Sequence, residues 1–509
     1  MAHAVSFPSR ALSEHRGLAF WMKRTLEELA NLRSEPNVDT VHDLRVSLRR
    51  CRSVAAVIEE VDPHPDWEEV RGIARKLFRA LGEWRDAQVT AEWLNQLQPE
   101  SDPLKAKMLE SLFGTEKTAR EKALHRATRF DENHWKNLAR ALSGRLRRVP
   151  LDGDAAHCLA LERLEEAREL HRCAMRTESA KPWHALRIGL KRLRYTAESF
   201  LPTAHAEWIE SLKRVQDVLG NIHDLDVLAA LLKKAAQQQH SLQNGEPRHD
   251  DWQDLIARER RKNLETYRQL TLGTTSVWNF WLCGFPRDSW AQYANARIRA
   301  TRAAMDDKPG RSRVIARLAL RLWSQLRTAK AGELFFDEKE RRVLDAAARM
   351  AGIRPVAKKG SREKSARSFL LRSPVPPSWT FAEWERMAWA IRFQRGTEPT
   401  QHNKRFSRLT AEQQSRIIPL AGILRVAIAA QKAGVTVSRS LRLEALPQGL
   451  LLHVVGVEDS PKNAARFTGA KRLLERSVGK TILIQPEPET NVATARNAEL
   501  KSTSISIVR

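Results

Sequence analysis

The first 305 residues carry a hydrophobic pattern that is helical almost throughout. Apolar residues recur every three or four positions in long segments rich in Ala, Leu, Arg and Glu, the spacing that buries one face of an α-helix. Short breaks separate these segments, among them SEPNVD (34–39), DPHPD (62–66) and RVPLDGD (148–154). A longer polar stretch, residues 237–251, is predicted to be a mobile loop. The pattern therefore predicts a mainly α protein.

The helical pattern continues through residues 313–435 and then changes. SLRLEAL (440–446) and LLLHVVGV (450–457), which flank PQG, predict a β-hairpin. The segment 463–479 predicts a helix that ends at a glycine, and 480–486 predicts a strand. The domain prediction that follows is a helical domain at 10–305, a second helical domain at 313–435, a small α+β piece at 436–486 and a disordered tail at 487–509.

One helical sequence motif occurs twice in the first domain. VHDLRVSLRRCR (41–52) is matched by WHALRIGLKRLR (183–194) at an offset of 142 (184 − 42). Further on, LGEWRD (81–86) is matched by LGNIHD (219–224) at an offset of 138 (219 − 81), and both are read as turns that end a long helix. Two matches in the same order predict a tandem duplication with halves at about 10–150 and 155–305. Each half is long enough for a four-helix bundle.

The net charge of the chain indicates the class of molecule that it binds. The 509 residues contain 87 Lys and Arg against 61 Asp and Glu, a net charge of +26. Such an excess attracts polyanions, and nucleic acid, inorganic polyphosphate and anionic lipid all remain open. No stretch approaches 18 uninterrupted apolar residues and the N-terminus has no apolar core, so neither a membrane span nor a signal peptide is expected. The four cysteines form no C-x-x-C pair, which favours reduced cytosolic thiols.

The repeated motif places its cations on one helical face. His42, Arg45, Arg49 and Arg52 are spaced by three or four residues and therefore stack above one another. The second copy repeats the column as His184, Arg187, Lys191 and Arg194. Arginine presents a planar fork of donors that matches phosphate oxygens, and lysine presents a compact charge. Two such columns favour a polyanion-binding site over a merely solvated basic face.

These residues resemble a known family. HDLRVSLRRCR and HALRIGLKRLRY are similar to the two signature helices of the conserved-histidine α-helical domain, CHAD, and the Leu-Gly-x-x-x-Asp segments match the same family. The resemblance covers about residues 10–305. It implies two pseudo-symmetric four-helix bundles around a basic cavity that binds inorganic polyphosphate, and association with cytoplasmic polyphosphate granules. The residues that it implies for the lining are His42, Arg45, Arg49, Arg50, Arg52, Arg75, Lys76, Arg79, His184, Arg187, Lys191, Arg192, Arg194, Lys213 and Arg214.

The two copies also differ. Cys51 stands opposite Leu193, and Arg85 stands opposite His223. The acidic residues of the Leu-Gly segments, Asp86 and Asp224 with Asp226, are interpreted as helix caps or partners of nearby arginines rather than as metal ligands. No metal site and no cofactor are therefore predicted.

Residues 313–435 resemble, in the order of their helices, the HD-like C-terminal region of exopolyphosphatases and guanosine-pentaphosphate phosphatases. Where that family's pattern has its histidine and acidic residues, this chain has Met350 and Ala351, a histidine-free stretch at 361–371, and Gln394. Thioether, methyl and amide groups are poor ligands for a hard cation. The resemblance thus implies a degenerate, metal-free domain, which would contact phosphate through Arg392, Arg395 and Arg425.

The leading hypothesis is therefore a non-enzymatic polyphosphate-binding protein of the cytoplasm, which associates with granules and with other granule proteins. Two alternatives stay open. One is a phosphohydrolase acting on polyphosphate or nucleotide polyphosphates, although no phosphate loop and no nucleophile elbow is present. The other is non-specific nucleic-acid binding, which net charge alone supports because aromatic residues do not interleave with the basic helices.

Overall fold

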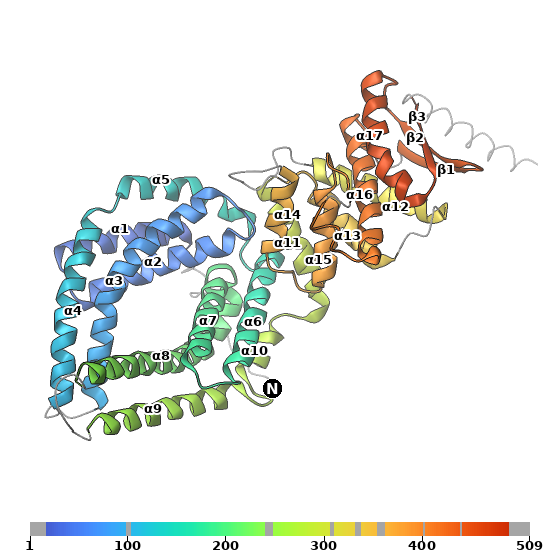
Figure 1. Cartoon of the computed structure of the whole chain (residues 1–509). Helices are drawn as coiled ribbons and strands as arrows, with labels where there is room; N and C mark the ends of the chain where they lie inside the picture. Colours follow the sequence, from blue (N-terminus) through green and yellow to red (C-terminus); the bar gives the residue numbers. More distant parts are fainter. Residues whose placement is uncertain are drawn as a thin grey trace, which may run out of the picture. The chain divides into compact units, whose positions relative to one another are not determined.

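The structure is a computed structural model that describes residues 17–97, 103–239, 248–305, 310–330, 337–353, 362–400, 403–437 and 440–487. The chain forms two compact units, Met1–Ala300 and Thr301–Arg509, and each is described by itself. The described part is mainly helical with one small sheet, so the predicted fold class is confirmed (Figure 1). The finer division of the C-terminal half into domains stays a prediction. Of the predicted tail at 487–509, Glu487 is the last residue of a strand and residues 488–509 lie outside the described residues.

The first half of unit 1 runs from α1 to α5. Its helices are α1 (Leu18–Ser34), α2 (Val38–Ile58), α3 (Pro65–Leu97), α4 (Pro103–Thr128) and α5 (Glu132–Ser143), followed by a 3₁₀ turn at Leu146–Arg148. The break at SEPNVD works as a cap: Asn37 accepts a hydrogen bond from the Thr40 amide at 2.9 Å, and Thr40 Oγ1 accepts one from the Asn37 amide at 3.1 Å. This reciprocal pair satisfies amides that the first turn of α2 would otherwise leave unbonded.

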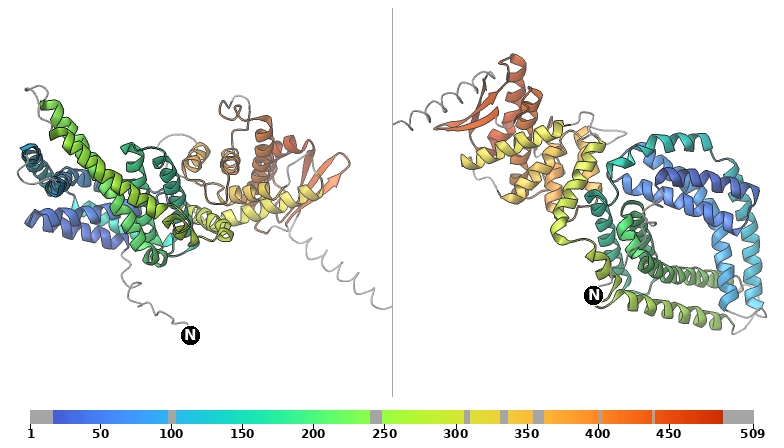
Figure 2. Two further views of the ribbon diagram at one scale, coloured as in Figure 1. Left: turned by 90° about the horizontal axis from the view of Figure 1, so that it is seen from below. Right: turned by 180° about the vertical axis from the view of Figure 1, so that it is seen from behind.

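The second half repeats the order. Its helices are α6 (Asp154–Ala174), α7 (Ala180–Phe200), α8 (Pro202–Gln239), α9 (Arg248–Thr271), α10 (Val277–Cys283) and α11 (Trp290–Ala304), with a 3₁₀ turn at Arg287–Ser289. The pairings of the first half recur: α2 packs on α3 as α7 packs on α8, and α3 runs beside α4 as α8 runs beside α9 (Figures 1 and 2). The duplication read from the sequence is therefore a duplication of helix pairings.

Two predictions about unit 1 are wrong. The Leu-Gly segments at 81–86 and 219–224 are not turns, because α3 and α8 continue through them to Leu97 and Gln239. A single glycine costs a helix only about 1 kcal/mol, which packing on both sides of it outweighs. The stretch 237–251 is also helical at both ends, as the close of α8 and the start of α9, and only 240–247 lies outside the described residues.

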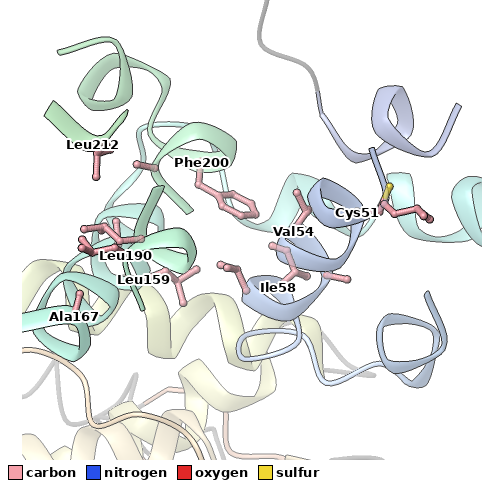
Figure 3. Packing of buried hydrophobic residues seen from close by; sticks show 14 of the residues in the cluster. Cys51, Val54, Ile58, Leu159, Ala167, Leu190, Phe200 and Leu212 are labelled. Atoms are coloured by element: carbon pink, nitrogen blue, oxygen red, sulfur yellow. The ribbon is translucent and has the colours of Figure 1, made fainter. Parts of the chain in front are cut away.

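One apolar core joins the two halves. Val54 and Ile58 of α2 are buried together with Leu159 of α6 and with Leu190 and Phe200 of α7. Figure 3 shows the Phe200 ring directed toward α2, close to Val54. Through this shared core the two basic helices, α2 and α7, pack against each other. Their cationic columns are thereby brought into one region.

Unit 2 is organised around one buried helix. Its elements are α12 (Arg311–Thr328), α13 (Glu338–Arg349), α14 (Arg362–Arg372), α15 (Phe381–Arg392), α16 (Ala411–Lys432), β1 (Leu441–Leu446), β2 (Gly449–Val455), α17 (Pro461–Val478) and β3 (Thr481–Glu487). Residues 420–430 of α16 are all buried, and α16 packs on α12, α13, α15 and α17. At Gly422 an added Cβ would lie 2.8 Å from Leu474 Cα, so glycine permits this close approach of α17.

The small sheet has the order β1-β2-β3. β1 and β2 form the predicted hairpin, with Leu443 opposite Leu452, and β3 joins β2 in parallel with Ile484 opposite Leu452. The helix between them, α17, ends at Gly479 in the left-handed conformation (φ 66°), which glycine adopts without strain. The predicted hairpin, helix and strand are confirmed. Among the described residues, no helix is both long and apolar enough to cross a membrane.

Candidate anion-binding site

The two cationic columns have the same arrangement in the structure. In α2 the side chains of Arg45, Arg49 and Arg52 are half-buried while His42 is exposed. In α7 the side chains of Arg187, Lys191 and Arg194 are half-buried while His184 is exposed. Helical spacing alone places the members of each column on one face, and the packing of α2 on α7 and of each on its long helix decides their partial burial.

Arg45 and Arg52 are held by the long helix α3. The Arg45 guanidinium donates to the Phe78 carbonyl at 3.2 Å and lies 4.4 Å from the centre of the Phe78 ring. Arg52 lies 4.9 Å from the same ring. Gly82, one turn further along α3, leaves room for this contact, because a Cβ there would meet Arg45 Nη1 at 3.1 Å. Ring contact and a carbonyl acceptor thus fix Arg45 without neutralising its charge.

The second half holds its last arginine by another route. Gln216 occupies the place of Phe78 at the offset of 138 (216 − 78). Its Oε1 accepts a hydrogen bond from Arg194 at 2.8 Å, and its Nε2 donates to the Leu190 carbonyl at 3.2 Å. The Gln216 amide therefore holds Arg194 in place, as the Phe78 ring holds Arg52. Neither Phe78 nor Gln216 was predicted from the sequence as a supporting residue. The offset of 138 between the long helices would have identified them as a matched pair.

Arg49 lies where α2 meets α7. Its guanidinium is 5.5 Å from the centre of the Tyr195 ring of α7. The Nε atoms of Arg49 and Arg187 are buried, and no described residue accepts a hydrogen bond from either. A buried donor without an acceptor is costly, so each is a position where an anionic oxygen would be stabilising.

Electrostatics shows that the two columns converge. Burial, followed by the positive charges of Arg187 and Arg49, lowers the pKa of the Lys191 ammonium to about 7, and Arg45 also contributes. Burial and the charge of Arg49 likewise lower the pKa of Arg187, while Asp224 opposes the shift. We call Arg45, Arg49, Arg187 and Lys191 the central cationic group. Its members come from two helices more than 130 residues apart in the chain.

A histidine pair borders this group. His184 Nδ1 and His223 Nδ1 are 3.2 Å apart, and their ring centres are separated by 4.6 Å. Burial, then the charges of Arg187, His184 and Lys191, lowers the pKa of His223 to about 4. The pKa of His184 is lowered too, again chiefly by burial. Both imidazoles are therefore neutral near pH 7, when they can share a single proton between their facing nitrogens.

Two carboxylates face the same group. Asp86 of α3 and Asp224 of α8 occupy matching positions, and burial raises the pKa of both. The charges of Arg45 and Arg187 oppose that shift at Asp86, and those of Arg187 and Lys191 oppose it at Asp224. Both lie in the middle of a helix, so the prediction that they cap helices is wrong. The alternative prediction of an arginine partner fits Asp226, which pairs with Arg260 at 2.7 Å.

Two predicted lining residues form ion pairs with neighbouring helices. Arg50 pairs with Glu198 of α7 and lies 4.5 Å from the centre of the Trp21 ring of α1. Arg192 is exposed and pairs with Glu166 of α6 at 2.7 Å. Each follows a member of the central cationic group by one residue, which rotates it about 100° around the helix. The sequence cannot separate neighbours of one charge type, and the structure assigns these two to ion pairs.

The remaining predicted cations lie on the long helices. Arg75, Lys76 and Arg79 of α3 and Lys213 and Arg214 of α8 are all exposed. Burial, then the charges of Arg75, Arg71 and Arg79, lowers the pKa of Arg52, so this part of α3 extends the positive region beyond Phe78. Lys213 and Arg214 take no part in the interactions of the central cationic group described above.

In unit 2 one of the predicted phosphate contacts, Arg425, has a structural role. Arg425 is nearly buried and donates to the carbonyls of Phe393, Gly396 and Thr397 at 2.7, 3.0 and 3.0 Å. Gln394 accepts a hydrogen bond from the Gly352 amide at 3.0 Å and is buried next to the turn that follows Ala351. Met350 and Ala351 are buried as well. In the described residues no three His, Cys, Asp or Glu side chains are grouped so that they could hold a metal ion.

Part of unit 1 matches a known family model. Residues 21–233 match the family model described as CHAD domain. The crystal structure of the CHAD domain from the plant Ricinus communis resembles the chain at 22% sequence identity and a TM-score of 0.36, over 56% of this chain and 98% of that chain. No curated protein matches the chain. The comparisons give no support to the resemblance of residues 313–435 to the exopolyphosphatase region.

Proposed function

We propose that this chain, whose residues 21–233 match the CHAD domain family model, binds inorganic polyphosphate through the central cationic group. One observation carries the proposal: four cations from two helices converge, and the buried Nε atoms of Arg49 and Arg187 have no acceptor among the described residues. Like charges so close together repel one another, and a bound polyanion would relieve this repulsion.

The chemistry of the group favours a phosphate polymer. Guanidinium forks match phosphate oxygens, and a helical turn rises about 5.4 Å, so successive cations can follow successive charged units of an extended chain. The column continues along α3 through Arg75 and Arg79, which are exposed beyond Arg52. Flexible linear polyphosphate can follow both helices, whereas base stacking would need exposed aromatic side chains beside the cations. The Phe78 and Tyr195 rings beside the cations are covered by Arg45, Arg49 and Arg52.

Charge reversal of the central cationic group tests the proposal. The variant R45E/R49E/R187E/K191E is expected to lose binding to long-chain polyphosphate, measured by titration calorimetry at moderate salt. Affinity of the parent should fall steeply as salt increases, by analogy with counterion release from nucleic acids. A neutral set, R45Q/R49Q/R187Q/K191M, gives the same test with less charge repulsion if the reversed variant unfolds.

A matched control separates site from net charge. Lys117, Arg126, Arg258 and Arg261 are exposed on α4 and α9, and their reversal changes the net charge by the same amount. The control variant is expected to bind nearly as well as the parent. Equal loss in both variants, with both folded by circular dichroism, would mean that only overall charge matters and that the central group is not the site.

The alternatives give different outcomes. Equal competition by RNA and polyphosphate for the parent protein would favour non-specific nucleic-acid binding. Metal-dependent release of phosphate from polyphosphate, with Mg²⁺ or Mn²⁺ added, would favour the phosphohydrolase. Granule association belongs to this proposal: a fluorescent fusion should form foci in cells that make polyphosphate and remain diffuse in cells that do not.

A further inference from the structure

Tyr195 of α7 contacts two consecutive arginines of α2. The ring is buried, and its centre lies 5.5 Å from the guanidinium carbon of Arg49 and 6.0 Å from that of Arg50. A cation and an aromatic ring attract each other at such distances. Neighbouring residues of a helix are about 100° apart around its axis. One ring of the second half therefore reaches both a member of the central cationic group and a residue outside it.

The two arginines differ in their other contacts. Arg50 forms an ion pair with Glu198 and lies 4.5 Å from the centre of the Trp21 ring, so it is held independently of Tyr195. The Arg49 Nε is buried, and no described residue accepts a hydrogen bond from it. Among the hydrogen bonds, ion pairs and ring contacts of the described residues, the Arg49 guanidinium takes part only in the contact with Tyr195. This ring is therefore the contact that constrains Arg49.

The contact exists on one side of the duplication only. At the offset of 142, Ser53 of α2 stands where α7 has Tyr195, and Ala56 stands where α7 has Glu198. The Ser53 hydroxyl donates to the Arg49 carbonyl of its own helix at 2.9 Å, and an alanine side chain has no polar group. The second half thus supplies the ring and the first half supplies the arginine, so the contact joins the two halves at the site.

We propose that Tyr195 is a positioning residue of the anion-binding site, which holds the Arg49 guanidinium in the central cationic group before the ligand binds. The proposal rests on the function proposed above and deepens it by naming a residue that acts through Arg49. A ring that packs on the face of a guanidinium leaves the N–H donors, which lie in the guanidinium plane, available to phosphate oxygens. Ordering a long side chain costs conformational entropy, and a side chain that is ordered in advance loses less when the ligand binds.

The variant Y195L removes the ring and keeps an apolar side chain. Its dissociation constant for long-chain polyphosphate, measured by titration calorimetry, is expected to be roughly fivefold higher than that of the parent, the effect of one cation–ring contact. Y195F keeps the ring and should bind within about twofold of the parent. An equal loss in Y195F and Y195L would mean that the hydroxyl matters rather than the ring, and the proposal would be overturned.

A double-mutant cycle shows whether Tyr195 acts through Arg49. The variant R49Q is expected to weaken binding in its own right. In the R49Q background, Y195L should cost less than about twofold in affinity, because no guanidinium is left to hold. If Y195L costs as much in this background as in the parent, its effect does not pass through Arg49 and the inference is wrong.

The variant F200L is the matched control. Phe200 is buried on the same helix, and its ring is directed toward α2, close to Val54 (Figure 3). No cation–ring contact of Phe200 is found within the described residues. F200L should lower stability in urea unfolding, as Y195L does, and leave affinity close to that of the parent. If folded F200L loses as much affinity as Y195L, the general packing of α2 on α7 sets the affinity, and Tyr195 has no special role.

The outcomes separate the two proposals. If the parent does not bind polyphosphate, the proposed function fails. If the parent binds and folded Y195L binds equally well, the proposed function stands and this inference fails. The variant Y195M carries the same test should Y195L not fold.

Discussion

At the scale of single residues, matched positions of the two halves have different chemistry. Arg49 of α2 corresponds to Lys191 of α7, and both belong to the central cationic group. A guanidinium stays charged at any physiological pH, whereas an ammonium loses its proton more readily when it is buried among other cations. The pKa of Lys191 is lowered to about 7, so this one residue makes the charge of the group depend on pH.

The residue-scale prediction concerns that dependence. Because a bound polyanion favours the charged ammonium, binding above pH 7 requires Lys191 to take up a proton, and affinity for polyphosphate should fall as pH rises from 6 to 8. One proton accounts for at most about a tenfold change per pH unit. The variant K191R should bind with little change over this range. His184 and His223, whose pKa values are lowered, would contribute only at more acidic pH.

Calorimetry in buffers of different ionisation enthalpy measures the proton uptake directly. The parent should take up close to one proton per site near pH 8, and K191R clearly less. An uptake that is unchanged in K191R would assign the titration to another group.

At the scale of elements, the long helices α3 and α8 decide how the cations are presented. Each carries a glycine at the same place, Gly82 and Gly220, and the sequence pattern read both as turns. Only one of them has a packing role. A Cβ at position 82 would meet the Arg45 guanidinium, while a Cβ at position 220 would meet nothing within 4 Å. Local sequence cannot make this distinction, since the atom that fills the space comes from another helix.

The element-scale prediction compares the two glycines. The variant G220A should stabilise the protein by up to about 1 kcal/mol, the difference in helix propensity, and leave polyphosphate affinity unchanged. The variant G82A gains the same propensity but displaces Arg45 from the Phe78 carbonyl, so affinity should fall several-fold. Urea unfolding and binding titrations on both variants check this. Equal affinity in the two variants would show that the position of Arg45 is not critical.

At the scale of the whole molecule, the site belongs to one compact unit. Every member of the central cationic group, its carboxylates and its supporting residues lie in unit 1. The buried pair Arg297–Glu162, joined at 2.6 Å, ties α11 to α6 and closes this unit on itself. Unit 2 has a separate buried centre in α16 and a different fold.

The prediction at this scale is that a fragment of residues 1–305, which ends after α11, folds alone and binds polyphosphate about as tightly as the full chain. Circular dichroism and a binding titration on the fragment check this, with a fragment of residues 306–509 as the comparison. Loss of affinity in a folded 1–305 fragment would show that unit 2 contributes to binding. Strong binding by 306–509 would place a second polyanion site there.

Most of the helices, the repeated order of the helices, the small hairpin with its helix and strand, and the two cationic columns could be predicted from the sequence. These follow from periodicity, capping and spacing, which are local properties of a helix. Which cations converge depends on how the helices pack on one another. Arg50 and Arg192 have the right charge and lie on the right helices, yet they form ion pairs with Glu198 and Glu166.

Packing likewise decides the pKa of Lys191 and the role of Gly82. It also brings Asp86 and Asp224 near the central cationic group. Each depends on atoms supplied by another helix, and burial and Coulomb interactions depend on distance in space rather than on separation along the chain.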